Sequence, residues 1–206
     1  MNLLFLIGPS ILIFIGLIVF QNVLVTFGLF YGWLLAVPLL YKVKWKWGFD
    51  RKALAAGILT GLVSLGAIYG TVALLKDSVF DLNEVRNLLL AWDFTGAKVW
   101  ILVLFLILVN PILEELYWRE FMFGRLVKFG TSKAIVTTSF FYALYHVFTV
   151  YLIFSFPFNV IAVLPVFVAG LMWGFMRFKL KSIAAPVISH MLADLGIMMV
   201  YVSFIA

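Results

Sequence analysis

Residues 99–119 read VWILVLFLILVNPILEELYWR, an apolar run that continues without a loop into two glutamates and an arginine. About 20 apolar residues cross a bilayer as a helix. Glu114, Glu115 and Arg119 are therefore predicted to lie in, or at the end of, a transmembrane helix. A charge at the bilayer centre costs about 2.5–3.5 kcal/mol on insertion scales, so such residues usually face an internal cavity and mark a functional site.

The composition of the whole chain agrees with this reading. Of 206 residues, 66% are hydrophobic and 12% are charged, whereas soluble domains have about 45–50% apolar and about 25% charged residues. We predict an all-α, polytopic membrane protein with a single transmembrane domain over residues 1–206. No cysteine is present, which excludes disulfides, thiolate metal sites and a cysteine nucleophile. The net charge of +6 comes from basic residues in short loops, so we expect no nucleic-acid partner.

The apolar runs predict about seven transmembrane helices, within a range of six to eight. Residues 3–41 are long enough for two spans, with a break at Gln21-Asn22. The other predicted spans begin at residue 53, 99, 134, 160 and 183, and they cover 53–75, 99 to about 113, 134–154, 160–176 and 183–205.

Local signals refine this outline. Residues 76–98 are polar, and apolar residues recur within them at helical spacing after Asp81 and Glu84, which resemble a capping box. We predict a short amphipathic helix on the membrane surface there. Asn110-Pro111 predicts a helix kink. Two small-xxx-small pairs in the third span, Gly57/Gly61 and Gly66/Gly70, predict close helix packing.

The basic residues predict the orientation. The loops around residues 42–52, 125–133 and 177–181 hold eleven lysines and arginines, and the opposite loops hold three. Cytoplasmic loops of membrane proteins are enriched in these residues. We therefore expect a multi-pass protein of the cell membrane with a cytoplasmic N-terminus and the C-terminus on the opposite side.

The first charged cluster combines a pair and a free acid. Glu115 and Arg119 are four residues apart, so they are neighbours on one helix face. Their pairing would leave Glu114, about 100° round the helix, free for other work. A plainer interpretation is that the helix leaves the membrane here and all three charges are solvated.

Both histidines of the chain lie in later spans. His146 follows Tyr142 by one turn, and His190 precedes Asp194 by one turn, so each pair shares a helix face. The plain alternatives are a hydrogen-bonded core histidine for His146 and a structural hydrogen bond for His190 and Asp194. Under the predicted topology all three clusters lie toward the cytoplasmic half of their spans and could meet in one polar cavity.

Such a cavity would suit three kinds of chemistry. A glutamate beside a neutral histidine can activate water, and a second histidine can stabilise an oxyanion, which together give peptide hydrolysis. Glu, His, His and Asp can also bind a metal ion, although no H-E-x-x-H spacing is present. Proton relays in transporters use the same residue types, but the chain has no repeated halves that would favour a transporter.

The order of the three motifs resembles the CAAX protease and bacteriocin-processing family, which includes the CAAX prenyl endopeptidases and abortive-infection-like membrane proteins. The family pattern is E-E-x-x-x-R, then F-x-x-x-H, then H-x-x-x-N/D, and the match covers about residues 99–205. Here the motifs are Glu114-Glu115-Leu-Tyr-Trp-Arg119, Tyr142-Ala-Leu-Tyr-His146 and His190-Met-Leu-Ala-Asp194. The resemblance implies an intramembrane endopeptidase of the glutamate type.

The resemblance also implies a role for each residue. Glu114 resembles the general base, His146 its assistant, and His190 and Asp194 the oxyanion-stabilising pair. Supporting roles fall to Glu115, Arg119 and Tyr142. Tyr142 replaces the family's phenylalanine and keeps the ring. Asp194 stands where eukaryotic members have asparagine and prokaryotic members carry aspartate; an ionised Asp194 would repel an oxyanion, so it would act protonated or by orienting His190.

The leading hypothesis is an endopeptidase that cleaves a small membrane-associated or prenylated peptide near its C-terminus. Eukaryotic relatives remove the last three residues of prenylated CAAX proteins. The expected partners are such a peptide or prenylated protein and the lipid bilayer, and no cofactor or metal is expected. The alternatives are a non-catalytic bacteriocin-immunity or partner-binding membrane protein that keeps the fold, and a metal-dependent peptidase.

Overall fold

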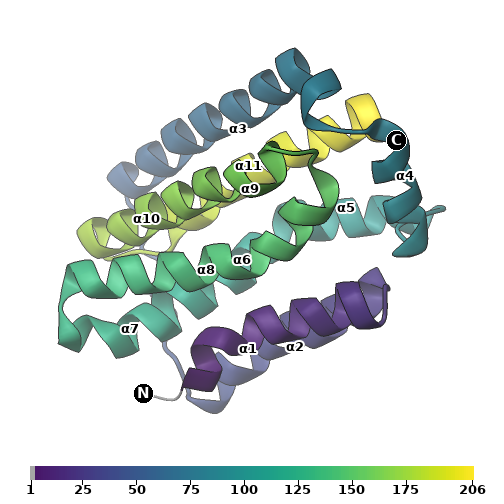
Figure 1. Cartoon of the computed structure of the whole chain (residues 1–206). Helices are drawn as coiled ribbons and strands as arrows, with labels where there is room; N and C mark the ends of the chain where they lie inside the picture. Colours follow the sequence, from purple (N-terminus) through teal and green to yellow (C-terminus); the bar gives the residue numbers. More distant parts are fainter. Residues whose placement is uncertain (1–2) are drawn as a thin grey trace.

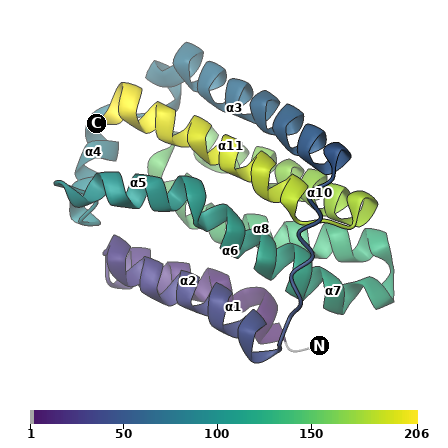
Figure 2. The same cartoon turned by 180° about the vertical axis from the view of Figure 1, so that it is seen from behind.

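The computed structural model describes residues 3–206 and shows a bundle of helices (Figures 1 and 2). Within that range every regular element is helical, as the sequence predicted. In chain order the elements are α1 (Leu3–Phe14), η1 (Ile15–Val19), α2 (Val23–Leu40), α3 (Arg51–Val79), α4 (Leu82–Ala91), α5 (Lys98–Leu108), α6 (Asn110–Glu115), η2 (Leu116–Met122), α7 (Phe123–Leu126), η3 (Val127–Phe129), α8 (Thr131–Ile153), α9 (Phe158–Ile161), α10 (Val163–Leu180), α11 (Ala184–Val200) and η4 (Tyr201–Ile205).

Among residues 3–206, six continuous helical stretches are long and apolar enough to cross a membrane, and the apolar stretch Leu3–Val19 is shorter, with 17 residues. This agrees with the predicted range of six to eight spans. The six stretches are Val23–Leu40, Arg51–Val79, Lys98–Phe129, Thr131–Ile153, Phe158–Leu180 and Ala184–Ile205. The chain is a multi-pass membrane protein.

The break predicted at Gln21-Asn22 is confirmed. Gln21 has a φ of 47°, and the side chain of Asn22 caps α2 by accepting hydrogen bonds from the amides of Leu24 and Val25, both at 3.0 Å. The chain reverses there, so α1 and α2 lie side by side (Figures 1 and 2).

The helix predicted within residues 76–98 is α4, and its capping residue is the predicted one. The Asp81 carboxylate accepts hydrogen bonds from the amides of Asn83 and Glu84. Val85 is buried, and the Arg86 guanidinium donates to the carbonyl of Ile205 at 2.8 Å. The helix therefore lies across the end of the bundle, against the C-terminal end of the chain (Figure 1).

At the kink predicted for Asn110-Pro111 the α-helix is interrupted at a single residue, because α5 ends at Leu108 and α6 begins at Asn110. Pro111 lacks the amide hydrogen that a continuous helix would use. After one and a half turns α6 passes into η2, a π-helical segment. Segments of this kind occur frequently at functional sites.

The two glycine pairs of α3 behave differently. A Cβ atom on Gly61 would lie 2.8 Å from Cβ of Leu192 and 3.0 Å from Cα of Ser189, and Gly57 meets α11 as closely. This pair lets α3 and α11 pack backbone to backbone. The prediction was wrong for Gly66 and Gly70, which have no atom within 4 Å of such a Cβ. Their spacing fits a packing motif, but no other described residue packs against these two positions.

The basic loops gather at one end of the bundle. The segment between α2 and α3 is tied to the start of α11, since the amide of Ile183 donates to Lys46 and the amide of Ala184 donates to Trp47. The C-terminus and α4 lie at the other end (Figure 1). This separation agrees with the charge asymmetry of the sequence, and the orientation in the membrane stays a prediction.

The glycine contacts give a first prediction. Gly61→Ala should destabilise the protein by about 1–3 kcal/mol, because the added methyl group overpacks the α3–α11 contact. Gly66→Ala is the matched control in the same helix and should leave stability unchanged or slightly raised. Unfolding of both variants in increasing SDS measures the effect. Equal stabilities for the two variants would contradict the assigned contact.

Candidate active site

The three predicted motifs converge inside the bundle. Glu114 and Glu115 end α6, Arg119 lies one turn further in η2, Tyr142 lies on α8, and His190 and Asp194 lie on α11. Their exposed fractions range from 0% for Glu115 and Arg119 to 8% for Asp194. The alternative of a solvated helix end is therefore wrong for Glu114, Glu115 and Arg119.

Arg119, Glu115 and His190 form a continuous chain of charged and polar groups. Nε of Arg119 lies 3.1 Å from Oε2 of Glu115, as the i,i+4 spacing predicted. The other oxygen of Glu115, Oε1, lies 3.1 Å from Nδ1 of His190. A carboxylate can only accept, so Nδ1 of His190 carries the proton and donates it. The ion pair therefore fixes both the orientation and the tautomer of the imidazole.

The opposite nitrogen of His190 faces three polar groups. Nε2 lies 3.4 Å from the Tyr142 hydroxyl, 3.5 Å from Oδ1 of Asp194 and 3.7 Å from Oε2 of Glu114. The Glu114 oxygen has no hydrogen-bond partner within the described residues. Here an imidazole nitrogen and a carboxylate oxygen without a hydrogen-bond partner face each other. This is the part of the cluster best suited to proton transfer.

Arg119 is accommodated in the interior by more than its carboxylate partner. Nη2 donates to the carbonyl of Gly170 at 3.2 Å. Its guanidinium carbon also lies 4.7 Å from the ring centre of Tyr142 and 5.6 Å from that of Trp173. Arginine stacks on aromatic faces in this way and is attracted to them. Side chains from α8 and α10 therefore surround the ion pair.

Two residues of the cluster were not predicted. The Asn110 side-chain amide donates to Oδ2 of Asp194 at 2.8 Å. The Trp173 ring stacks on His190, with ring centres 4.1 Å apart and planes 19° apart. Asn110 carried a signal, because it is a polar residue in an apolar run one turn before Glu114. Trp173 carried none, since tryptophan is common in membrane helices.

His146 lies at the edge of the cluster. Its ring stacks on Tyr145 at 4.3 Å, and its Nδ1 lies 2.9 Å from the carbonyl oxygen of Tyr142. Nδ1 must donate there, so Nε2 is the free, accepting nitrogen. No hydrogen bond or ion pair of the described residues joins His146 to Glu114. The histidine nearest to Glu114 is His190.

Metal-binding geometry was one of the alternatives. In the part of the chain that the structure describes, no group of three or more His, Asp or Glu side chains is arranged to hold a metal ion. The acidic residues of the site instead contact nitrogen groups of Arg119, His190 and Asn110.

The fold and the site define a multi-pass membrane protein with a buried glutamate–histidine cluster. The family model described as Type II CAAX prenyl endopeptidase Rce1-like matches residues 96–196, about half of the chain. The chain belongs to this CAAX protease family, and the matched segment contains every residue of the cluster. No curated protein and no solved structure matches the chain.

The buried ion pair generates a second prediction. Arg119→Met should destabilise the protein by about 3–5 kcal/mol, because it leaves the Glu115 carboxylate buried without its cation. The double variant Arg119→Met/Glu115→Gln should recover part of this loss, because no unpaired charge remains. Unfolding in SDS measures these two variants and the single variant Glu115→Gln. A double variant as unstable as the sum of the two single changes would contradict the pairing.

Proposed function

We propose that this chain is an intramembrane endopeptidase that hydrolyses a peptide bond near the C-terminus of a small membrane-associated or prenylated peptide, with a water molecule as nucleophile. The observation that carries the proposal is the buried pair of Glu114 and His190, in which Oε2 of Glu114 lies 3.7 Å from Nε2 of His190. Membership of a CAAX protease family supports the reaction class.

Glu114 is the proposed general base. Its Oε2 is buried without a hydrogen-bond partner among residues 3–206, and so is the hydroxyl of Tyr145, which lies near the Glu114 carboxylate. A water molecule held by Glu114 would lose a proton to it as the water oxygen bonds to the scissile carbonyl carbon. The same proton would then pass to the leaving amine nitrogen when the carbon–nitrogen bond breaks.

His190 is the proposed partner of the developing oxyanion. Because the proton on Nδ1 is held there by its hydrogen bond to Glu115, Nε2 can donate only when the imidazole is doubly protonated. Glu114, Glu115 and Asp194 all contact this ring, and three nearby carboxylates favour a cation. The cationic ring would stabilise negative charge on the carbonyl oxygen.

Asp194 is proposed to position His190. One of its oxygens is held by Asn110 and the other faces Nε2 of His190. His146 is proposed to assist from the edge of the cluster, where its unprotonated Nε2 can accept a hydrogen bond from water and orient it. In this arrangement the histidine next to the proposed base, Glu114, is His190. The sequence analysis expected His146 in that position.

An apolar groove supports a lipidated substrate. The groove has a volume of about 190 Å³ and runs between α5 and α11. Its first residue on α11, Leu195, follows Asp194, and Ile107 on α5 lies one turn before Asn110. A hydrocarbon chain in this groove would lie beside the catalytic cluster. The lining residues are Val103, Ile107, Leu195, Met198, Met199, Val202 and Ser203.

The role of Glu114 gives the central prediction. Glu114→Gln should lower kcat by at least about a hundredfold, because the amide cannot accept the proton of water. His190→Ala and His146→Ala should also abolish cleavage. The assay follows cleavage of prenylated and unprenylated peptides by the purified protein in lipid nanodiscs, with mass spectrometry of the products.

The matched control is Glu84→Gln, which changes an exposed glutamate of α4 and should cleave as the wild type does. Full activity of Glu114→Gln would overturn the proposed mechanism. If the Glu114→Gln variant lost cleavage but still conferred the cellular phenotype of the protein, a non-catalytic immunity or binding role would replace the proposal.

Asp194 gives a separate prediction. Asp194→Asn should keep most of the activity, because the single amide oxygen can still accept the hydrogen bond that Asn110 donates to Oδ2 and so keep the side chain in place beside His190. The measurement is the ratio of kcat/KM in the variant to that in the wild type. A complete loss of cleavage in a folded variant would show that a negative charge is required there.

A further inference from the structure

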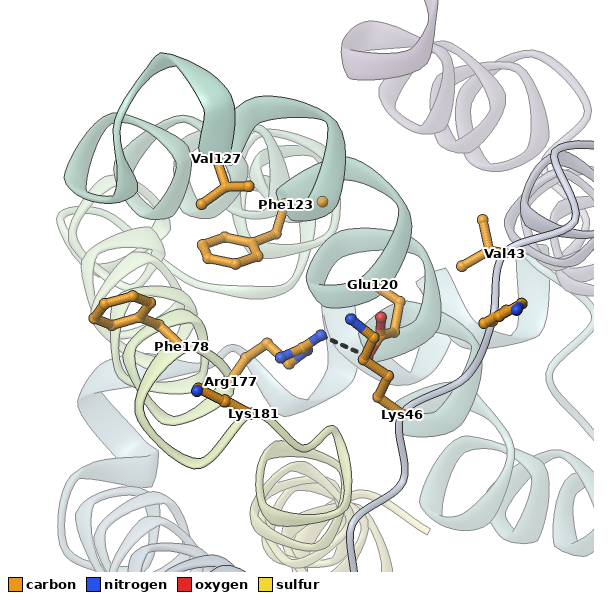
Figure 3. Close-up of a pocket in the computed structure, with 10 residues that line it drawn as sticks. Val43, Lys46, Glu120, Phe123, Val127, Arg177, Phe178 and Lys181 are labelled. Carbon is orange, nitrogen blue, oxygen red and sulfur yellow. Dashed lines mark ion pairs between the residues drawn. The ribbon is translucent and has the colours of Figure 1, made fainter.

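A second site lies at the end of the bundle where the basic loops gather (Figure 3). It is a pocket of about 550 Å³ between the α2–α3 linker, the η2–α7 segment and the end of α10. Sites for small ligands have volumes of about 300–1,000 Å³. Basic and apolar side chains share the wall, and none of them belongs to the catalytic cluster. The lining residues are Val43, Lys44, Lys46, Glu120, Phe123, Gly124, Val127, Arg177, Phe178 and Lys181.

The pocket has an excess of positive charge. Four basic side chains line it together with a single carboxylate, that of Glu120, which gives a net charge of +3. Lys44, Lys46 and Lys181 are exposed, and none of them forms an ion pair within the described residues. Figure 3 shows Arg177 reaching from α10 toward Glu120, with Lys46 of the linker beside that carboxylate. The charge of the pocket therefore suits an anionic ligand.

Arg177 is a buried cation with few partners. Its Nη2 lies 2.9 Å from Oε1 of Glu120, and the two side chains are only 9% and 5% exposed. The other buried arginine, Arg119, has a backbone carbonyl and two aromatic rings beside its carboxylate, and Arg177 has neither within the described residues. A guanidinium has five N–H donors. A ligand in the pocket can therefore supply acceptors that the protein does not.

The pocket lies at the depth of the lipid headgroups. The spans around it begin or end close to its wall, since α2 ends at Leu40, α10 ends at Leu180 and α8 begins at Thr131. Tryptophan is enriched at membrane–water interfaces, and Trp45 and Trp47 alternate with the two pocket lysines of the linker. The anionic group present at this depth in a membrane is the phosphate of a phospholipid.

An apolar stripe on α10 continues from the pocket along the helix. Phe178 lines the pocket, and residues spaced by three and four positions share its helix face back to Leu164. These two residues are 14 positions apart, or about 21 Å along the axis, which is more than half of the hydrocarbon core of about 30 Å. An acyl chain of one leaflet can therefore lie along the stripe. The stripe consists of Leu164, Val168, Leu171, Phe175 and Phe178, and all but Leu171 are exposed.

We propose that this pocket binds the phosphate group of an anionic phospholipid from the leaflet at the basic end of the bundle. Lys44, Lys46 and Arg177 bind the phosphate, and an acyl chain follows the stripe on α10. Basic pockets between transmembrane helices recognise anionic headgroups by the same physics. The headgroup of phosphatidylcholine carries a positive charge of its own, so the net charge of the pocket discriminates against that lipid.

Native mass spectrometry of the purified protein tests the proposal, because it counts bound lipids. Phosphatidylglycerol and phosphatidylcholine with identical acyl chains are titrated separately. The protein should bind one phosphatidylglycerol with a Kd at least about tenfold lower than its Kd for phosphatidylcholine, as expected for several cations around one anionic headgroup. Equal Kd values for the two lipids would overturn the site.

A competition experiment distinguishes a lipid from a soluble phosphate compound. The competitors are inorganic phosphate and glycerophosphoglycerol, which is the headgroup without acyl chains. Neither should displace phosphatidylglycerol at a hundredfold molar excess, because neither contacts the apolar stripe of α10. Displacement by either competitor at that excess would show a site for a soluble phosphate and overturn its assignment to a lipid.

Lysine variants locate the bound lipid. Lys44→Gln/Lys46→Gln should weaken the binding of phosphatidylglycerol by at least about threefold. The matched control, Lys128→Gln/Lys133→Gln, removes the same charge from exposed lysines that do not line the pocket, and it should bind as the wild type does. Equal losses in the two variants would show a diffuse attraction to the basic loops and contradict a defined pocket.

A charge-neutral double variant tests the arginine. Arg177→Gln/Glu120→Gln removes the ion pair and leaves the net charge of the pocket at +3. It should weaken the binding of phosphatidylglycerol by at least about tenfold, because the guanidinium fork is lost. The control Lys98→Gln/Asp93→Asn removes a more exposed ion pair and should bind as the wild type does. Wild-type affinity in a folded Arg177→Gln/Glu120→Gln variant would overturn the role of Arg177. If this variant does not fold, the lysine variants decide.

Discussion

The fully buried ion pair between Glu115 and Arg119 is the constraint on which the rest of the structure depends. Transfer of a charge into an apolar interior costs several kcal/mol even after relaxation, so each group needs its partners in place. Arg119 finds them in Glu115, the carbonyl of Gly170 and two aromatic rings. These partners come from α6, α8 and α10, and Glu115 adds α11 through His190. Four spans are thereby held at one depth.

Helix α11 reaches the Glu115–Arg119 ion pair with one face and packs closely against α3 with the other. Gly57 and Gly61 of α3 allow this close packing, and hydrogen bonds between polar side chains fix the position of α11 along its neighbours. The hydroxyl of Thr60 on α3 donates to Ser189 on α11, and the indole of Trp173 on α10 donates to the same oxygen, both at 3.0 Å. Ser189 precedes His190, and Trp173 stacks on it. Trp173 therefore contacts the imidazole directly, and Thr60 holds the neighbouring Ser189 in place. Neither residue takes part in the proposed chemistry.

Sequence reasoning succeeded where the membrane or the helix repeat imposes the answer. Bilayer thickness sets the length of the apolar runs, and 3.6 residues per turn brings Glu115 to Arg119. It was less successful for contacts across helices. Depth along a span does not say which helices are neighbours, so His146 was assigned to Glu114 although His190 is nearer. Gly66 and Gly70 have the spacing of a helix-packing motif, but no other described residue packs against them. Trp173 stacks on His190, although it belongs to no recognisable sequence motif. Only the tertiary arrangement distinguishes these cases.

Adjacent residues of η2 carry two different ion pairs. Arg119 points into the bundle and is fully buried there. Glu120, the next residue, forms an ion pair with Arg177 at the wall of a pocket at the basic end of the bundle. Breaking the first pair leaves a fully buried charge without its ion-pair partner. The second pair borders a pocket with three lysines, where a displaced Glu120 carboxylate still has cations nearby. One helical segment therefore holds a fully buried pair that contacts His190 and a second pair at the wall of a pocket.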